Sequence, residues 1–243
     1  MGVFTSAKQT LVLFFLFTLL FTAGFAGAAL SADFQISIQS PQIASGKLTM
    51  ASAPGSYSFL ATRAHASQDM SAFKKWSNMR ERRARIQIGE QERLQNEWFG
   101  NIRKMNGLPL IEKIHGVNNW LNRQAYIEDS RNWGRADYWA TPLEFLARGG
   151  DCEDYAIAKY AALAALGVEE SRLRLAIVKD LKKNIPHAVL LVLGDNETFV
   201  LDNQETHKIR AASFAGRYKP IYAINRQAWW LHRADERMEL ASR

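Results

Sequence analysis

The residues around the single cysteine of this chain have types and a spacing that suit nucleophilic catalysis. Cys152 follows a pair of glycines and stands between two acidic residues, Asp151 and Glu153. A run of good helix formers starts immediately after it and ends at Gly167, which predicts that Cys152 lies in the first turn of a helix. Unpaired backbone N–H groups and the helix dipole favour a thiolate there. Cys152 is therefore a candidate nucleophile.

Two downstream residues could supply a base and the group that orients it. His187 opens a short apolar run and Asp202 closes the next, and the turn residues 194–196 between them predict a β-hairpin. The two side chains could then be cross-strand neighbours. His207 is the main rival to His187 as the base. It lies in a predicted loop, whereas a central strand would hold an imidazole rigidly.

The acidic residues beside the cysteine create an electrostatic problem for a nucleophile. Asp151, Glu153 and Asp154 place negative charge close to the thiol, which should raise the pKa of Cys152. A bound cation with oxygen ligands would offset that charge, and calcium suits carboxylates and backbone carbonyls. Alternatively, the carboxylates point away and stabilise only the start of the helix. The residues by themselves leave both interpretations open.

The composition is that of a folded protein and excludes several classes of site. The chain has 243 residues, of which 47% are hydrophobic and 11% aromatic. One cysteine excludes an internal disulfide framework and a multi-cysteine zinc site. The net charge of +7 comes mostly from residues 74–93, where basic residues alternate with glutamates. Such a run is typical of a solvated helix face, and no nucleic-acid recognition motif accompanies it.

The first 30 residues are predicted to be a signal peptide. Lys8 supplies positive charge, residues 11–25 are apolar or small, and a cluster of small residues follows at 26–29, as a cleavage site requires. Counted through Leu30, the stretch reaches about 20 residues, so an uncleaved membrane anchor is the alternative. In both cases we expect the rest of the chain to leave the cytoplasm, which in a bacterium means the periplasm.

After this segment, residues 31–66 are rich in Ser, Ala, Gln and Gly and are predicted to be a linker. One domain is expected over residues 67–243. Its predicted helices cover 68–105 with a break near Gly89, 110–126, a short helix begun by the capping box of Thr141 and Glu144, and the cysteine helix. Its predicted strands cover 173–178, 187–193, 198–202 and 218–224, the last at a sheet edge because of Pro220, with a partly helical tail over 226–243.

Four stretches of the chain resemble a known family. They are Asp137–Glu144, Gly150–Tyr160, His187–Leu190 and Leu201–Asn203. Together they are similar to the bacterial transglutaminase-like cysteine proteinases, and within that family to the LapG-type periplasmic proteases. The resemblance spans residues 70–225 and is most specific around the cysteine.

This resemblance implies a fold and a catalytic site. The fold is an α+β fold of the transglutaminase or papain-like type, in which N-terminal helices and the cysteine-bearing helix pack on an antiparallel sheet. Cys152 is then the nucleophile, His187 the general base and acid, and Asp202 the orienting carboxylate. The backbone N–H of Cys152 would form part of the oxyanion hole, and the loop of Tyr138 and Trp139 is the candidate for its second donor. Trp139 is also a candidate wall of the substrate site, with a core role as the alternative.

The resemblance also implies a biological role. Family members are periplasmic endopeptidases that cut a large surface adhesin in its N-terminal region, beside a pair of alanines. The adhesin is then released and the biofilm disperses. An inner-membrane receptor for cyclic di-GMP holds the protease inactive through its periplasmic domain. Calcium is required, which favours Asp151 and Glu153 as calcium ligands in this chain.

Two other classes of function remain compatible with the residues. One is a transglutaminase-fold acyltransferase or amidase, because transfer and hydrolysis pass through the same thioester. The other is a non-catalytic binding module of the same fold. The intact set of cysteine, histidine and aspartate argues against a binding module, since a module without activity is free to lose any of the three.

Overall fold

The structure of the protein is a computed structural model that describes residues 59–60, 62–86 and 91–234. The predicted signal peptide and most of the predicted linker lie outside these residues, as do residues 235–243. Across the described part of the chain, no helix combines the length and the apolar character needed to cross a membrane.

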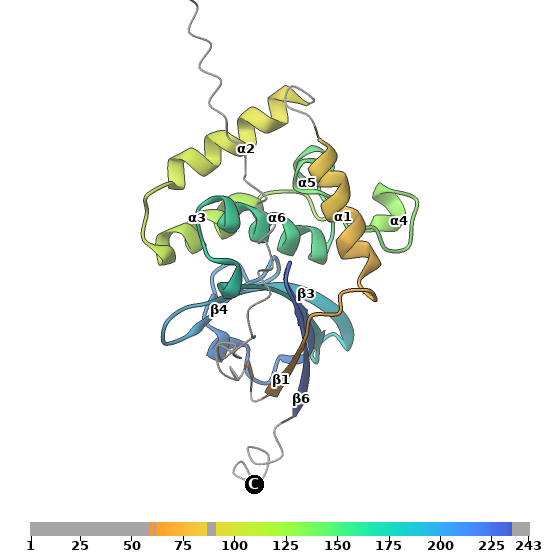
Figure 1. The fold of residues 1–243 in the computed structure, drawn as a ribbon, viewed down its shortest axis with the longest axis vertical. Helices are drawn as coiled ribbons and strands as arrows, with labels where there is room; N and C mark the ends of the chain where they lie inside the picture. The colour runs from red at the N-terminus through yellow and green to blue at the C-terminus, as the bar shows by residue number, and fades with distance from the viewer. Residues whose placement is uncertain (1–58, 61, 87–90, 235–243) are drawn as a thin grey trace, which may run out of the picture. The chain divides into compact units, whose positions relative to one another are not determined.

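Helices and an antiparallel sheet form two layers of one domain, with the helices gathered on one side of the sheet (Figure 1). The strands have the order β1-β6-β5-β2-β3-β4 in the sheet. Their bounds are β1 Thr62–Ser67, β2 Leu173–Asp180, β3 Ile185–Leu193, β4 Thr198–Leu201, β5 Tyr218–Ile224 and β6 Trp229–Ala234. The helices are α1 Lys74–Arg85, α2 Glu92–Met105, α3 Leu110–Leu121, α4 Asp129–Asn132, α5 Pro142–Arg148 and α6 Cys152–Ala165, with 3₁₀ turns at Glu170–Arg172 and Ala211–Phe214.

Helix α6 lies in the centre of the domain and starts at Cys152, as the sequence predicts. Every residue from Asp154 to Leu163 is buried. Its alanines allow close packing against β2 and β3 on one side and against α3 and α5 on the other. The helix ends before Gly167, whose φ of +81° suits glycine. The core between the layers therefore fixes the position of the cysteine.

Both faces of the sheet are covered. The larger core lies between the sheet and the helices and includes Leu175, Leu190 and Val192. Neighbouring residues on the same strands, such as Val189 and Leu191, point to the opposite face, where they pack in a second core. Burial on both faces explains why the β2 and β3 sequences read as nearly continuous apolar runs.

The predicted α+β architecture is confirmed in its central parts. Strands β3 and β4 form an antiparallel hairpin, as the turn residues 194–196 predict, and β2 pairs antiparallel with β3 on its other side. The capping box at the start of α5 is present, because the Thr141 side chain accepts from the Glu144 N–H while the Glu144 carboxylate accepts from the Thr141 N–H. This box fixes where the chain enters α5, one short helix before the cysteine.

The two ends of the described domain differ from the prediction. The prediction places residues 62–66 in the linker and makes residues from Arg226 onward partly helical. Instead, β1 and β6 pair with each other along their whole lengths, from Thr62 opposite Ala234 to Ser67 opposite Trp229. The tryptophans of β6 favour a strand, and β1 covers the edge that β6 would otherwise expose.

Strand β5 was predicted to be an edge strand because of Pro220, and this is wrong for the strand as a whole. It lies between β2 and β6. However, β6 pairs only with Tyr222–Ile224, so Pro220 faces no strand on that side. On the other side, a bulge brings Val178 opposite Pro220 and Ile177 opposite Tyr222. The proline therefore lies beside a bulge and has one side without a partner strand, which are the positions that sheets tolerate for proline.

Candidate active site

The glycines before Cys152 allow the chain to turn into α6 in a crowded place. Gly149 has a φ of +73°, and a Cβ added to it would lie 2.3 Å from the Ala125 carbonyl oxygen. A Cβ added to Gly150 would lie 2.1 Å from an Asp154 carboxylate oxygen. The Gly150 N–H donates to that Ala125 oxygen at 3.2 Å, which ties the turn to the preceding loop. Only glycines fit here, so they fix the start of the cysteine helix.

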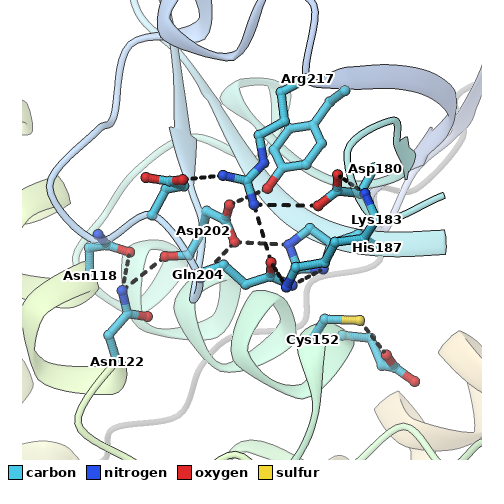
Figure 2. Close-up of polar contacts among 12 residues, drawn as sticks. Asn118, Asn122, Cys152, Asp180, Lys183, His187, Asp202, Gln204 and Arg217 are labelled. Carbon is cyan, nitrogen blue, oxygen red and sulfur yellow. Dashed lines mark hydrogen bonds and ion pairs between the residues drawn. The ribbon is translucent and has the colours of Figure 1, made fainter. Parts of the chain in front are cut away.

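His187 and Asp202 are brought together as predicted. The Nε2 atom of His187 lies 2.9 Å from Oδ1 of Asp202 (Figure 2), and both side chains are buried. His187 is on β3, and Asp202 follows β4 immediately, beyond the last residue of that strand that pairs with β3. The hairpin therefore places the carboxylate beside the imidazole from just outside the ladder.

Asp202 is held by several donors. The Tyr218 hydroxyl donates to Oδ2 at 2.5 Å, and the Gln204 backbone N–H donates to Oδ1 at 2.9 Å. Burial opposes ionisation of this carboxyl, but the bonds from His187, Gln204 and Tyr218 outweigh it and hold the pKa of Asp202 below its usual value. Asp202 is therefore an ionised acceptor for the imidazole.

Lys159, a residue that sequence reasoning did not single out, lies in the same buried region. It is fully buried on α6, two turns after Cys152, and its Nζ has no hydrogen-bond partner among the described residues. Burial lowers the pKa of Lys159 to about 7, although attraction to Asp202 acts in the opposite direction. No local pattern marks Lys159 as buried, because a lysine in an alanine-rich helix normally faces solvent.

The thiol of Cys152 is directed toward the acidic side of the site. Its Sγ donates to Oε2 of Glu153 at 3.2 Å (Figure 2). Burial is the largest cause that raises the pKa of Cys152, and the charges of Glu153 and Asp151 raise it further. The sequence predicted the effect of the carboxylates, while the larger effect of burial follows from the packing of α6. The cysteine is therefore a thiol in this arrangement.

Five carboxylates gather beside Cys152. Metal-ligating atoms lie within 4.8 Å of one another in two groups of carboxylates, one formed by Asp129, Asp137 and Glu153 and one by Asp129, Asp151 and Asp154. The predicted metal ligands Asp151 and Glu153 are both among them, and so is Asp154. Sequence reasoning missed Asp129, which belongs to no motif. It also missed Asp137, which opens one of the four stretches that carry the family resemblance but is not marked there as a ligand.

The carboxylates of this cluster are only partly satisfied by the protein. Asp154 accepts from the Ala140 N–H at 2.7 Å, and Asp129 accepts from the Tyr138 N–H, so both bind the loop before α5. Their other oxygens, and Oδ1 of Asp151, are buried without a hydrogen-bond partner among the described residues. Burial, with the neighbouring acidic groups, raises the pKa of Asp151 to about 9 and that of Asp154 to about 8. Oxygen-rich sites of this kind suit a hard cation.

A cavity of about 800 Å³ contains the reactive groups. Cys152 and His187 both line it, together with Asp129, Asp137, Asp151 and Glu153 of the acidic cluster. Its lining also includes aromatic and apolar residues at the start of α1 and on the sheet: Phe73, Trp76, Ile177, Tyr222, Trp229 and Leu231. A cavity of this size accommodates several residues of an extended peptide or one small ligand.

Trp139 and His207 are the two remaining sequence candidates. Trp139 lines the cavity and is also part of the core, where its ring packs edge-on against Trp76 with centroids 6.4 Å apart. The structure thus places it where both predicted roles, core and wall, are possible. His207 is exposed and does not line the cavity, whereas His187 does. The arrangement favours His187 as the base.

The chain is similar in sequence and in fold to known bacterial proteins. The family model of the bacterial transglutaminase-like cysteine proteinase BTLCP matches residues 101–237. Among solved structures, Legionella pneumophila LapG in a calcium-bound form is 31% identical over 65% of this chain and 86% of that chain, with a TM-score of 0.52. A second structure of Legionella pneumophila LapG is 31% identical over 69% of this chain and 91% of that chain, also with a TM-score of 0.52. An EGTA-treated form of that protein is 32% identical over 65% and 84% of the two chains, with the same TM-score of 0.52. A search of curated protein sequences found no match.

Proposed function

Because this chain belongs to the bacterial transglutaminase-like cysteine proteinases, we propose that it is a cysteine endopeptidase whose catalytic residues are Cys152, His187 and Asp202. The observation that carries this assignment is the shared cavity. Cys152 and His187 both line it, and the far side of the imidazole is bonded to the buried Asp202 at 2.9 Å. This arrangement supports a nucleophile, a base and an orienting carboxylate that act together in one site.

The reaction would proceed by proton transfer and acyl transfer. Nδ1 of His187 takes the thiol proton, and the sulfur attacks the peptide carbonyl carbon. The oxyanion that forms is stabilised by the backbone N–H of Cys152 at the start of α6. His187 then protonates the leaving amine, which leaves a thioester on the enzyme. Water deprotonated by His187 hydrolyses the thioester and regenerates the thiol. Throughout, Asp202 keeps Nε2 protonated and stabilises the imidazolium.

Calcium fits the acidic cluster. Asp129, Asp151 and Asp154 each have a buried oxygen with no hydrogen-bond partner in the described part of the chain, and such oxygens are the hard ligands that calcium prefers. Asp151 and Glu153 would hold the ion with help from the other acidic residues of the cluster. A bound divalent cation would offset the negative charge that raises the pKa of Cys152. The calcium-bound form of Legionella pneumophila LapG supports this proposal.

The substrate proposed here is the N-terminal region of a large surface adhesin, cut beside a pair of alanines, so that the adhesin is released and the biofilm disperses. The support is the similarity to LapG and the placement of Trp139 in the cavity wall near Cys152. Replacing either substrate alanine by leucine should lower the cleavage rate about tenfold or more, since a bulky wall rejects added methylenes. Equal cleavage of the leucine peptide would contradict a small-residue site.

The partner and the location follow from the same similarity and from the N-terminal segment. We propose export to the periplasm by residues 1–30 and inhibition there by an inner-membrane receptor for cyclic di-GMP. N-terminal sequencing of the mature protein should find a start between Ala28 and Asp33. A membrane-bound chain that retains Met1 would show that the segment is an anchor.

The central experiment is cleavage of an adhesin N-terminal fragment by variants of the triad. Cys152→Ala and His187→Ala should each lower kcat/KM by at least about a thousandfold, because each removes a group that takes part in bond breaking. The matched control is His207→Ala, an exposed histidine outside the cavity, which should cleave like the unaltered protein. Full activity of Cys152→Ala would refute the assignment.

A further inference from the structure

We propose that Gln204 is a positioning residue of this protease. Its side chain donates a hydrogen bond to the nitrogen of His187 that must receive the proton of Cys152, and this bond slows the reaction of the thiol. This inference rests on the proposed assignment of Cys152, His187 and Asp202. It adds a residue that lies outside that triad and outside the motifs that carry the family resemblance.

The contacts of Asp202 determine which nitrogen of His187 is available. Asp202 is ionised and can only accept, so Nε2 of His187, at 2.9 Å, carries the hydrogen of that bond. In a neutral imidazole the other nitrogen, Nδ1, is then an acceptor with one lone pair in the ring plane. This lone pair is the one that must take the thiol proton.

Gln204 already contacts that nitrogen. Its side-chain Nε2 lies 3.3 Å from Nδ1 of His187 (Figure 2). The amide oxygen at the other end accepts from Lys183 Nζ at 2.6 Å and from Arg217 Nη2 at 3.2 Å. Lysine and arginine have no acceptor, so the oxygen must face them and the NH₂ group must face the imidazole. Gln204 therefore donates to Nδ1.

Further contacts fix the position of Gln204. Arg217 forms ion pairs with Glu205 and with the buried Asp180, which fix the guanidinium that binds the Gln204 oxygen. The Gln204 backbone N–H donates to Oδ1 of Asp202 at 2.9 Å. Gln204 thus contacts both His187 and Asp202, the imidazole through its side chain and the carboxylate through its backbone.

These contacts compete with the first step of the reaction. Proton transfer breaks the S–H bond of Cys152 and forms an N–H bond at Nδ1, which gives a thiolate and an imidazolium. An N–H at Nδ1 would face the N–H of Gln204, so the amide must turn away before the proton can move. In the structure Gln204 already donates to Nδ1 at 3.3 Å, so the nitrogen that must accept the proton is engaged in another hydrogen bond. Gln204 therefore stabilises the unreacted state.

The test is the rate at which iodoacetamide alkylates Cys152 at one fixed pH with calcium in excess. Gln204→Leu and Gln204→Met keep the approximate size of the side chain but lack an N–H donor. Each should react roughly fivefold faster than the unaltered protein, the ratio expected when one neutral hydrogen bond is lost. The matched control is Gln227→Leu, an exposed glutamine in the turn between β5 and β6, which should react at the unaltered rate.

A second readout separates positioning from a purely structural role. In protein labelled with ¹⁵N-histidine, Gln204→Leu should move the Nδ1 resonance of His187, while Nε2, bonded to Asp202, should stay in place. A glutamine that served only to hold Arg217 and Lys183 would change thermal stability and leave Nδ1 unaffected. Unchanged or slower alkylation by folded Leu and Met variants would overturn the proposal.

The same experiments distinguish the two levels of inference. If Cys152→Ala still cleaves the substrate, the triad is wrong and the role of Gln204 falls with it. If Cys152→Ala is inactive but removal of the Gln204 amide does not accelerate alkylation, only the role of Gln204 is refuted.

Discussion

Two groups of residues flank Cys152 and are built in opposite ways. The first, the sheet wall, consists of His187, Asp202, Gln204 and Tyr218, and its hydrogen bonds are complete within the protein. Both carboxylate oxygens of Asp202 have donors, from His187 and Gln204 on one oxygen and from Tyr218 on the other. These bonds hold the pKa of Asp202 low although the residue is buried. The fold alone therefore assembles the base and its orienting group.

The wall at the start of α6 is incomplete. One oxygen each of Asp129, Asp151 and Asp154 is buried without a hydrogen-bond partner among the described residues. Burial raises the pKa of Asp154 and, with the charge of Glu153, that of Asp151. Burying ionised carboxylates without partners destabilises the fold unless a cation neutralises their charge. The comparison teaches that the fold organises general-base chemistry by itself, whereas a charge from outside must complete the surroundings of the nucleophile.

The largest expected effect comes from breaking the sheet wall. Asp202→Asn should lower kcat/KM roughly 10³- to 10⁴-fold, because an amide cannot stabilise the imidazolium and can hold His187 in the wrong tautomer. The measurement is steady-state cleavage of the adhesin fragment. The control is Asp195→Asn, an exposed carboxylate paired with Arg172 at 2.7 Å, which should have almost no effect. A mild effect of Asp202→Asn would mean that the sheet wall does not act as a unit.

A smaller and reversible effect should come from the other wall. We expect strong chelation to stop cleavage, calcium to restore it, and magnesium to restore it poorly, since magnesium requires a tighter octahedral shell. Asp151→Ala and Glu153→Ala should need roughly 10- to 100-fold more calcium for half-maximal activity, because each removes a ligand. The measurement is the cleavage rate against free calcium. A rate that ignores chelation, with no calcium retained by the purified protein, would show that these carboxylates only stabilise the helix start.

The weakest expected effect is on stability against pH, and it has opposite signs on the two walls. Asp151 and Asp154 have raised pKa values, about 9 and about 8. Their contribution to the free energy of unfolding is therefore fully present below the unfolded pKa of a carboxyl, and it is lost as the pH rises through those raised values. Asp202 has a lowered pKa, so its contribution is present above the unfolded value and is lost only as pH falls through the lowered one.

Thermal unfolding can test that difference in sign. In EGTA, the melting temperature should fall as pH rises from about 5 to about 9, and calcium should flatten the fall because it replaces the protons on these carboxylates. Asp154→Asn should flatten it without calcium. An equally steep fall in calcium would mean that the ion does not bind at these carboxylates.

The same contrast explains what could be predicted from the sequence. The sheet wall was predictable because His187 and Asp202 lie at the ends of two short apolar runs joined by a clear turn signal, and the turn sets their proximity. Asp151 and Glu153 were predictable because they adjoin the cysteine. Asp129 and Asp137 were not, since only tertiary packing of the preceding loop brings them to α6.

Other features depended on contacts that local patterns cannot show. Strand β1 has a composition that resembles a linker, and it becomes a strand because β6 offers an edge. Gln204 follows Asp202 without belonging to a motif, and the orientation of its amide is set by Lys183 and Arg217, which lie elsewhere in the sequence. Sequence patterns thus report periodicity and neighbours, whereas long-range pairing and polar networks require the folded chain.

The burial of α6 has a consequence for how this enzyme would lose activity. Helix ends ordinarily fray, but the first turn of this helix carries the nucleophile and is clamped between a core on its C-terminal side and a glycine turn hydrogen-bonded to Ala125 on the other. Local opening cannot displace Cys152 without disrupting the centre of the domain. Inactivation by urea should therefore coincide with cooperative unfolding of the whole domain, so that proteolytic activity serves as a direct gauge of the folded fraction.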